Sequence, residues 1–213
     1  MVEAILWDND GVLVDTERLY FQATRQALAR ARIELTLDLY KDISLRQGRS
    51  LFSLVDKKGW TAEQVAALRL ERDEIYSGLL RAEPLLFPEV SETLRELHNK
   101  YRMAIVTSSR RVHFDVMHEK TEIWKYFEFV LAREDYGKSK PNPEPYLTAL
   151  RRLGIAAEKS VAIEDTERGL SAARAAGLRC VVVPHEFTRG CEFAGAEAVI
   201  ESVSELAGLL KRL

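Results

Sequence analysis

The chain has 213 residues, of which 46% are hydrophobic and 30% are charged. This composition is typical of a folded globular protein rather than a disordered or membrane-spanning one. The 31 Lys and Arg residues nearly balance the 33 Asp and Glu residues and give a formal net charge of -2. That balance excludes the broad positive surface on which nucleic-acid binding depends, so we expect neither a nucleic acid nor a membrane as partner.

The N-terminal segment and the cysteines indicate where the protein acts. Only four apolar residues, Ala4 to Trp7, lie between acidic residues near the N-terminus, and this run is too short for a signal peptide or a membrane helix. Cys180 and Cys191 show no spacing typical of a disulfide framework or a zinc site. We therefore expect a cytoplasmic protein, and we expect a monomer.

Short apolar runs alternate with helical patterns along most of the chain. Continuous runs of this kind are typical of strands buried on both faces, and they occupy residues 2–7, 103–107, 160–163, 180–183 and 198–200. Helical spacing recurs between them, over residues 90–97, 146–153 and 170–176, with Gly177 as a stop signal. Strands separated by helices predict a doubly wound parallel α/β sheet, a Rossmann-like core.

One interval departs from this alternation. Residues 16–83 contain helical patterns only, at 16–32, 37–45 and 61–80, and Thr61 with Gln64 forms a capping-box pair at the start of the last one. We interpret residues 16–83 as an inserted all-helical cap domain. The core domain then comprises residues 1–15 and 84–213.

Polar residues follow the predicted strands, at the sheet edge where α/β proteins bind their ligands. The residues expected to converge there are Asp8 and Asp10 after the first strand, Thr107, Ser108 and Ser109 after the second, Glu164 and Asp165 after the third, and Lys140 before Pro141 in a loop. Converging carboxylates repel one another unless a cation neutralises them. An oxygen-only ligand set of this kind favours Mg²⁺.

Four motifs in this order carry a resemblance to a known family. They are residues 7–17 beginning Trp-Asp-Asn-Asp-Gly, residues 104–107, residues 140–146, and residues 163–166 with the small residues that follow. The chain is similar to the haloacid dehalogenase superfamily of phosphotransferases, in the capped subgroup of β-phosphoglucomutase and phosphoglycolate phosphatase. It departs from the usual pattern at Asn9, where an apolar residue is common, and at Glu89 and Thr166.

The resemblance implies a role for each of these residues. Asp8 would attack phosphorus and form an aspartyl-phosphate, and Asp10 would act as general acid and base. Thr107 and Lys140 would hold the phosphoryl oxygens, assisted by Ser108 and Ser109. Mg²⁺ would be held by Asp8, the Asp10 carbonyl and Asp165, with Glu164 either a direct ligand or a support for the ligands. The cap would contribute substrate-binding residues at Arg46, Gly48 and Arg49.

The predicted function is Mg²⁺-dependent hydrolysis of a small phosphate monoester, such as a sugar phosphate or a phosphoglycolate-like ester. A β-phosphoglucomutase-type phosphomutase is the main competing function. Tyr20 argues against it, because the mutase has a histidine at the matching position and a phenol cannot share a proton in the same way at neutral pH.

Three further protein classes fit less well. A receiver-like signalling module is about half this length and has no helical insertion. A dehalogenase does not need Asp10. A phosphonate hydrolase would need a cap lysine, for which Lys41, Lys57 and Lys58 are candidates, and another residue at Asp10. The four histidines show no ligand spacing, and we expect them to be structural or surface residues.

Overall fold

The computed structural model describes residues 1–56 and 58–213. The chain divides into two compact units. Met1–Asp15 and Leu86–Leu213 form one of them, here called the core unit, and Thr16–Leu85 forms the other, here called the helical unit. None of the helices in the described ranges is both long and apolar enough to cross a membrane.

The core unit contains a six-stranded parallel sheet. Its strands are β1 (Ala4–Trp7), β2 (Arg102–Val106), β3 (Val130–Leu131), β4 (Ser160–Glu164), β5 (Arg179–Val182) and β6 (Ala198–Val199). They pair in the order β3-β2-β1-β4-β5-β6, and Trp7 at the end of β1 lies between Ile105 and Ile163. The predicted α/β fold class is confirmed. β3 was not predicted, although it lies in a short apolar run at residues 129–132, of which only Val130 and Leu131 form the strand.

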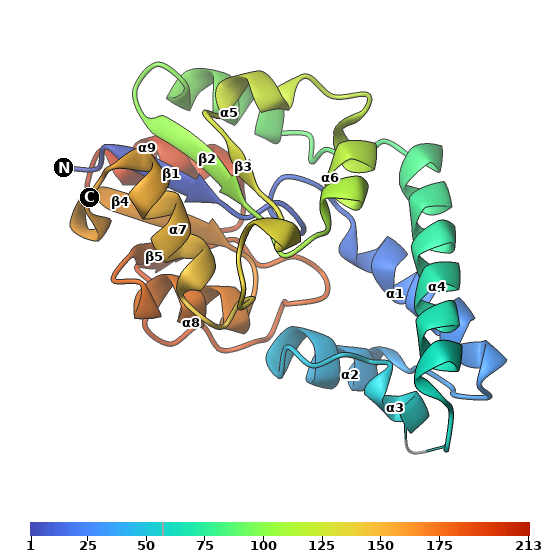
Figure 1. The fold of residues 1–213 in the computed structure, drawn as a ribbon. Helices are drawn as coiled ribbons and strands as arrows, with labels where there is room; N and C mark the ends of the chain where they lie inside the picture. Colours follow the sequence, from blue (N-terminus) through green and yellow to red (C-terminus); the bar gives the residue numbers. More distant parts are fainter. Residues whose placement is uncertain (57) are drawn as a thin grey trace. The chain divides into compact units, whose positions relative to one another are not determined.

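Alternating strand residues face two separate hydrophobic cores. Ile5 and Trp7 pack with α5 (Val90–Leu97), α6 (Arg111–His118) and α9 (Leu206–Leu210). Ala4 and Leu6 point the other way and pack with α7 (Glu144–Leu153) and α8 (Glu167–Ala175). The sheet therefore lies between two helical layers, with α5 on one side and α7 and α8 on the other (Figure 1). This burial on both faces explains why the strand sequences are continuously apolar.

Short helices connect the longer elements of the core unit. The 3₁₀ segments are Ile123–Tyr126, Arg133–Asp135, Ala157–Lys159 and Val203–Glu205. Gly154 directly follows α7, and Gly177 follows α8 by two residues; both glycines have a positive φ, which is favourable for glycine at the end of a helix.

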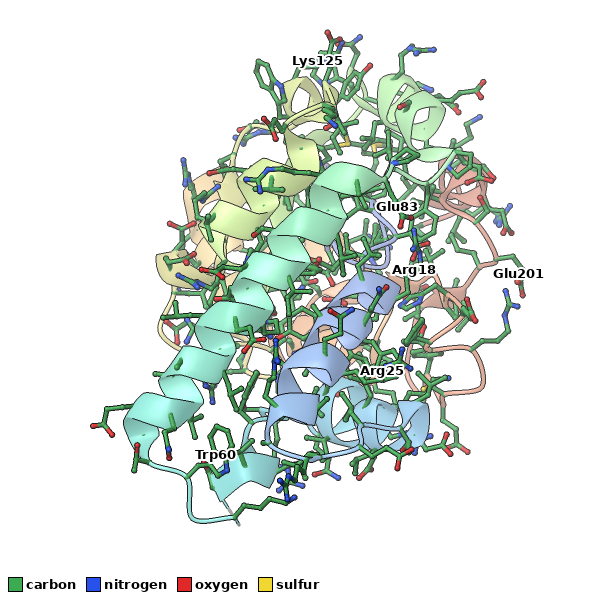
Figure 2. All side chains as sticks on the ribbon, turned by 90° about the vertical axis from the view of Figure 1, so that its right-hand side faces the viewer. Arg18, Arg25, Trp60, Glu83, Lys125 and Glu201 are labelled. Atoms are coloured by element: carbon green, nitrogen blue, oxygen red, sulfur yellow. The ribbon has the colours of Figure 1, made fainter. Side chains whose placement is uncertain are left out.

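The helical unit is built around two neighbouring helices, α1 (Glu17–Arg30) and α4 (Ala62–Ala82). An Arg18–Glu83 ion pair of 2.5 Å joins the start of α1 to the residue after α4, and both side chains are labelled in Figure 2. The predicted capping box is present, because the Gln64 backbone N–H donates to Thr61 Oγ1 and the Thr61 backbone N–H donates to Gln64 Oε1.

The remaining helices of this unit are short. They are α2 (Leu37–Tyr40), a π-helix at Lys41–Arg46, and α3 (Ser53–Asp56). One continuous helix was expected over residues 37–45, whereas the structure changes from α to π geometry at Lys41. The described residues of the helical unit contain no strand, as expected.

Candidate active site

The loop after β1 brings two carboxylates to the end of the sheet. The Asp8 amide donates to Ile163 O at 2.9 Å and so continues the pairing between β1 and β4. The chain then turns tightly, because Asn9 O accepts from the amides of Leu13 and Val14. Asp8 is buried and Asp10 is half-buried. The loop therefore holds both predicted carboxylates at the edge where β1 ends.

Gly11 permits the close approach of this loop to the end of β4. Its φ is +79°, a conformation that residues with a side chain rarely adopt, and a Cβ at this position would overlap Asp165 Oδ2. The first and fourth predicted motifs are therefore in contact at Gly11.

The loop after β2 contacts the Asp10 carboxylate. Thr107 Oγ1 and Ser109 Oγ donate to Asp10 Oδ2 at 3.0 and 2.9 Å, and the Ser109 amide donates to Thr107 Oγ1 at 2.9 Å. Ser108, the residue between them, is half-buried. The structure thus brings the end of the second motif directly onto Asp10.

Lys140 is buried at the centre of the candidate site, with a side-chain exposure of 2%. Its Nζ lies 3.0 Å from Asp8 Oδ1 and 2.7 Å from Glu164 Oε1, and it donates to Val106 O at 2.8 Å. Burial favours the neutral amine, but the Asp8 and Glu164 carboxylates outweigh it and raise the pKa of Lys140 above its ordinary value. Lys140 is therefore a buried cation between two of the predicted carboxylates.

Glu164 is the most constrained of the carboxylates. Its Oε1 accepts from Lys140 and, at 2.5 Å, from the Tyr146 hydroxyl, while its Oε2 lies 3.4 Å from the Asp165 amide. Gly169 in α8 leaves room for this carboxylate, because a Cβ there would overlap both Glu164 oxygens. Glu164 is thus held on several sides by protein groups.

The acidic side chains Asp8, Glu164 and Asp165 offer ligand atoms that lie within 4.8 Å of one another. All three side chains are buried, and the Lys140 ammonium lies between Asp8 and Glu164. Burial and then the Glu164 charge raise the pKa of Asp8 to about 7, with Lys140 opposing the shift. Burial also raises the pKa of Asp165. The cluster therefore holds more negative charge than its protein partners neutralise.

This donor set fits a small divalent cation. The atoms available are carboxylate oxygens, which Mg²⁺ prefers to nitrogen or sulfur. Asp165 Oδ2 accepts from His185, whereas Asp165 Oδ1 is buried and has no hydrogen-bond partner among the described residues. A buried carboxylate oxygen without a donor is costly, and coordination to a metal ion would satisfy it.

Two of the four histidines, all expected to be structural or surface residues, contact residues of the candidate site. His185 Nε2 lies 2.9 Å from Asp165 Oδ2, and His118 Nε2 lies 2.8 Å from Asn9 Oδ1. His185 follows β5 by three residues, so the strand-end rule applied to this strand would have found it. His118 ends α6, and no spacing in the sequence relates it to Asn9.

The cap residues predicted to bind substrate belong to the helical unit. Arg46 ends the π-helix, Gly48 has a φ of +61°, and the Arg49 amide donates to Ile43 O at 2.9 Å. Arg49 also lines a cavity of about 50 Å³ together with Arg69 and Arg72. This part of the helical unit is therefore rich in guanidinium groups.

Comparison with known proteins identifies the family. A model of the haloacid dehalogenase-like hydrolases matches residues 5–183. The chain is 33% identical to the protein CbbY of Cereibacter sphaeroides, over 98% of this chain and 96% of the relative. It is 31% identical to a phosphorylated carbohydrates phosphatase of Thermotoga maritima over the whole of both chains. It is also 30% identical to a phosphoglycolate phosphatase of Shigella boydii, over 68% of this chain and 58% of the relative.

Solved structures agree with this assignment. A mutant of CbbY from Rhodobacter sphaeroides, in complex with xylulose-1,5-bisphosphate, superposes with a TM-score of 0.83 at 27% identity, covering 98% of this chain and 99% of that one. The chain belongs to the haloacid dehalogenase-like hydrolases, in the subgroup that the sequence resemblance indicated. Within that family it is a phosphatase, a phosphoric monoester hydrolase.

The family match and the structure also provide evidence on two protein classes that fitted the sequence less well, the receiver-like module and the phosphonate hydrolase. A receiver-like module has neither this fold with its helical insertion nor this family match. Of the lysines considered for a phosphonate hydrolase, Lys58 donates to the backbone carbonyls of Ala31 and Arg32. Lys57 lies outside the described residues.

Proposed function

We propose that this protein hydrolyses a small phosphate monoester, a sugar phosphate or a phosphoglycolate-like ester, with Mg²⁺ and through an aspartyl-phosphate on Asp8. The observation that carries the proposal is the buried cluster at the end of the sheet, in which Lys140 bridges Asp8 and Glu164 beside Asp165. Phosphoryl transfer depends mainly on positioning and on stabilising charge, and this cluster supplies both.

The proposed reaction has two steps. In the first, the Asp8 carboxylate bonds to phosphorus while the ester P–O bond breaks, and Asp10 gives a proton to the leaving oxygen. In the second, Asp10 takes a proton from water, whose oxygen attacks the same phosphorus, and the bond between Asp8 and phosphate breaks. The hydroxyls of Thr107 and Ser109 on Asp10 Oδ2 support this role, because they hold the carboxylate beside Asp8.

Lys140 and Thr107 are proposed to hold the phosphoryl oxygens, with Ser108 and Ser109 assisting. The residues proposed to hold Mg²⁺ are Asp8, the Asp10 carbonyl and Asp165. Glu164 already accepts from Lys140 and Tyr146, so we propose that it supports the ligands rather than binding the ion directly. When bound, Mg²⁺ would offset the carboxylate charge and stabilise the negative charge on the phosphoryl group.

The substrate proposal rests on the relatives together with the chemistry of the helical unit. Two relatives have names that state a substrate: the Thermotoga maritima phosphatase acts on phosphorylated carbohydrates and the Shigella boydii phosphatase on phosphoglycolate. The CbbY complex contains a sugar bisphosphate. Such molecules carry hydroxyls and often a second anionic group. Arg46, Gly48 and Arg49 are proposed to recognise that part of the substrate, and the guanidinium-lined cavity beside Arg49 supports this choice.

A phosphomutase of the β-phosphoglucomutase type is the second candidate, because the subgroup contains both activities. Tyr20 favours the hydrolase. Its ring lies edge-on to Tyr76, with 5.2 Å between centroids, and the Arg72 guanidinium lies 4.6 Å from it. A tyrosine held in this way does not offer the exchangeable proton of a cap histidine.

Product analysis separates hydrolase from mutase. With β-glucose 1-phosphate and a sugar bisphosphate primer, the hydrolase releases free phosphate and glucose, whereas efficient formation of glucose 6-phosphate would overturn the assignment. If Tyr20 is the reason, the variant Tyr20→His raises the ratio of transfer to hydrolysis. An unchanged ratio would remove this explanation.

A substrate panel tests the proposed function as a whole. Purified protein with Mg²⁺ is assayed for phosphate release from phosphoglycolate, sugar monophosphates and sugar bisphosphates. We expect release from at least one of these esters and background rates with excess chelator. Full activity in the presence of chelator would contradict the proposal.

A further inference from the structure

Asn9 stands out in the first motif, because it places a buried amide between Asp8 and Asp10. Its side chain has 0% exposure, so its polar atoms need partners inside the protein. Asn9 Oδ1 lies 2.8 Å from His118 Nε2, and Asn9 Nδ2 lies 3.4 Å from Asp10 Oδ2 and 3.2 Å from Met117 Sδ. The amide thus connects the end of α6 to the carboxylate proposed as acid and base.

We propose that His118 and Asn9 form a positioning pair for Asp10, in which His118 fixes the Asn9 amide so that its NH₂ group faces the Asp10 carboxylate. This inference rests on the proposed function, since it assumes that Asp10 protonates the leaving group. Neither His118 nor Asn9 touches the substrate in this proposal. Their role is to hold Asp10 in one orientation.

The protonation of His118 determines how the pair works. An amide oxygen only accepts hydrogen bonds, so His118 Nε2 carries the proton that Asn9 Oδ1 receives. The other ring nitrogen, Nδ1, lies 3.0 Å from the Thr121 hydroxyl, which can donate to it. Burial lowers the pKa of His118 to about 4, against the opposing effect of Asp10. At neutral pH His118 is therefore uncharged, and its contact with Asn9 Oδ1 requires the tautomer that carries the proton on Nε2.

The orientation of the Asn9 amide follows from these contacts. With the amide turned over, its oxygen would face the Asp10 carboxylate, and its NH₂ group would face the N–H of His118. Both contacts would be repulsive. His118 thereby selects the orientation that directs a donor toward Asp10.

Asp10 is consequently held from two elements. Thr107 and Ser109, in the loop after β2, donate to its Oδ2. The Asn9 amide, which contacts His118 at the end of α6, lies near the same oxygen. Efficient proton transfer to a leaving group needs the acid within hydrogen-bond reach and correctly aligned. Loss of the pair would misalign the acid without changing how the phosphate is bound.

A series of aryl phosphates tests this proposal, because a poor leaving group needs protonation and a good one does not. For His118→Leu, we expect kcat/KM, which reports the steps up to leaving-group departure, to fall about tenfold with phenyl phosphate but less than about threefold with p-nitrophenyl phosphate. His118→Gln keeps a donor at a similar distance, so it restores most of the phenyl phosphate rate. An equal loss with both esters would overturn the proposal, as would unchanged rates.

Two further variants separate positioning from general damage. His113→Leu is the matched control, since His113 is a buried histidine of the same helix, and we expect it to leave the ratio of the two rates unchanged. His118→Leu leaves the Asn9 oxygen without its donor and costs stability. The double variant Asn9→Leu, His118→Leu replaces both polar groups, and it should recover stability while keeping the leaving-group effect. Recovery of the phenyl phosphate rate in this double variant would contradict the proposal.

Asp10→Asn distinguishes failure of this inference from failure of the proposed function. If Asp10 is the acid, Asp10→Asn lowers kcat/KM more for phenyl phosphate than for p-nitrophenyl phosphate. If it does so and His118→Leu does not, only the positioning pair is wrong. If Asp10→Asn lowers kcat/KM equally for both esters, the acid role itself is wrong.

Discussion

The Asp8 carboxylate is subject to two opposing electrostatic effects, attraction by Lys140 and repulsion by Glu164. It is a buried carboxylate paired with Lys140, and it lies close enough to Glu164 for the two charges to repel. Burial and this repulsion raise its pKa to about 7 in the metal-free protein. A carboxylate in this position lowers the free energy of unfolding, and active sites commonly carry such a cost in stability.

This shift predicts how stability depends on pH in the presence of chelator. The ordinary pKa of the Asp8 carboxyl is 3.8 and the folded value is about 7, so between these values the folded state holds the proton more tightly than the unfolded state. The free energy of unfolding therefore falls as pH rises from about 4 to about 7, because Asp8 must ionise in its buried position. Asp8→Asn removes this loss.

We expect Asp8→Asn to raise the free energy of unfolding on the order of 2 kcal/mol at pH 8, which is a rise of roughly 4–8 °C in melting temperature, and to change it little at pH 4.5. Thermal denaturation in chelator at the two pH values measures this difference. The exposed Asp115→Asn is the control and should show no such pH dependence. A variant less stable than the parent at pH 8 would contradict the expected sign.

At the scale of an element, α8 is shaped by the carboxylate packed beneath it. Thr166 caps this helix by accepting from the Gly169 amide at 3.2 Å, and Gly169 leaves the space that Glu164 occupies. The helix thus starts close to the site because one of its residues has no side chain.

Gly169→Ala should therefore be harmful, although alanine favours helices. The added methyl group would displace the Glu164 carboxylate from Lys140 and Tyr146, and we expect a loss of about 1–3 kcal/mol in unfolding free energy with at least a tenfold loss in kcat. Gly78→Ala in α4 is the matched control, because beyond its own stretch of helix the added Cβ would meet no atom of the described residues within 4 Å. It should gain about 0.5–1 kcal/mol. Similar stability changes in the two variants would contradict this account of Gly169.

Elements with strong local signals could be predicted from the sequence. The strands β1, β2, β4 and β5 are continuous apolar runs, and the Thr61–Gln64 pair marks the start of α4. β3 was not predicted, although residues 129–132 form a short apolar run, of which only Val130 and Leu131 pair with β2. The π-helix at Lys41–Arg46 was also missed, because it shows the same apolar spacing as an α-helix over so short a range.

At the scale of the whole molecule, parallel topology explains why the candidate site could be predicted in outline. Residues that follow parallel strands meet at one edge of the sheet, so Asp8, Thr107 and Asp165 could be placed together without any coordinates. His185 follows β5, so the same rule applied to that strand would have placed it beside Asp165. His118 could not be placed, because its contact with Asn9 depends on how α6 packs. Sequence spacing carries no record of that packing.

Asp8 is proposed to carry the phosphoryl group during turnover, and chemical trapping of this aspartyl-phosphate is the sharpest test of the mechanism. Asp10→Asn is mixed with Mg²⁺ and p-nitrophenyl phosphate, whose leaving group needs little protonation, so that the aspartyl-phosphate forms but is hydrolysed slowly. After acid quenching, borohydride reduction converts a phosphorylated aspartate to homoserine, which peptide mass spectrometry detects. We expect this conversion at Asp8, and none in a variant that also carries Asp8→Asn. Nitrophenol release without any modification of Asp8, or modification at another residue, would contradict the account.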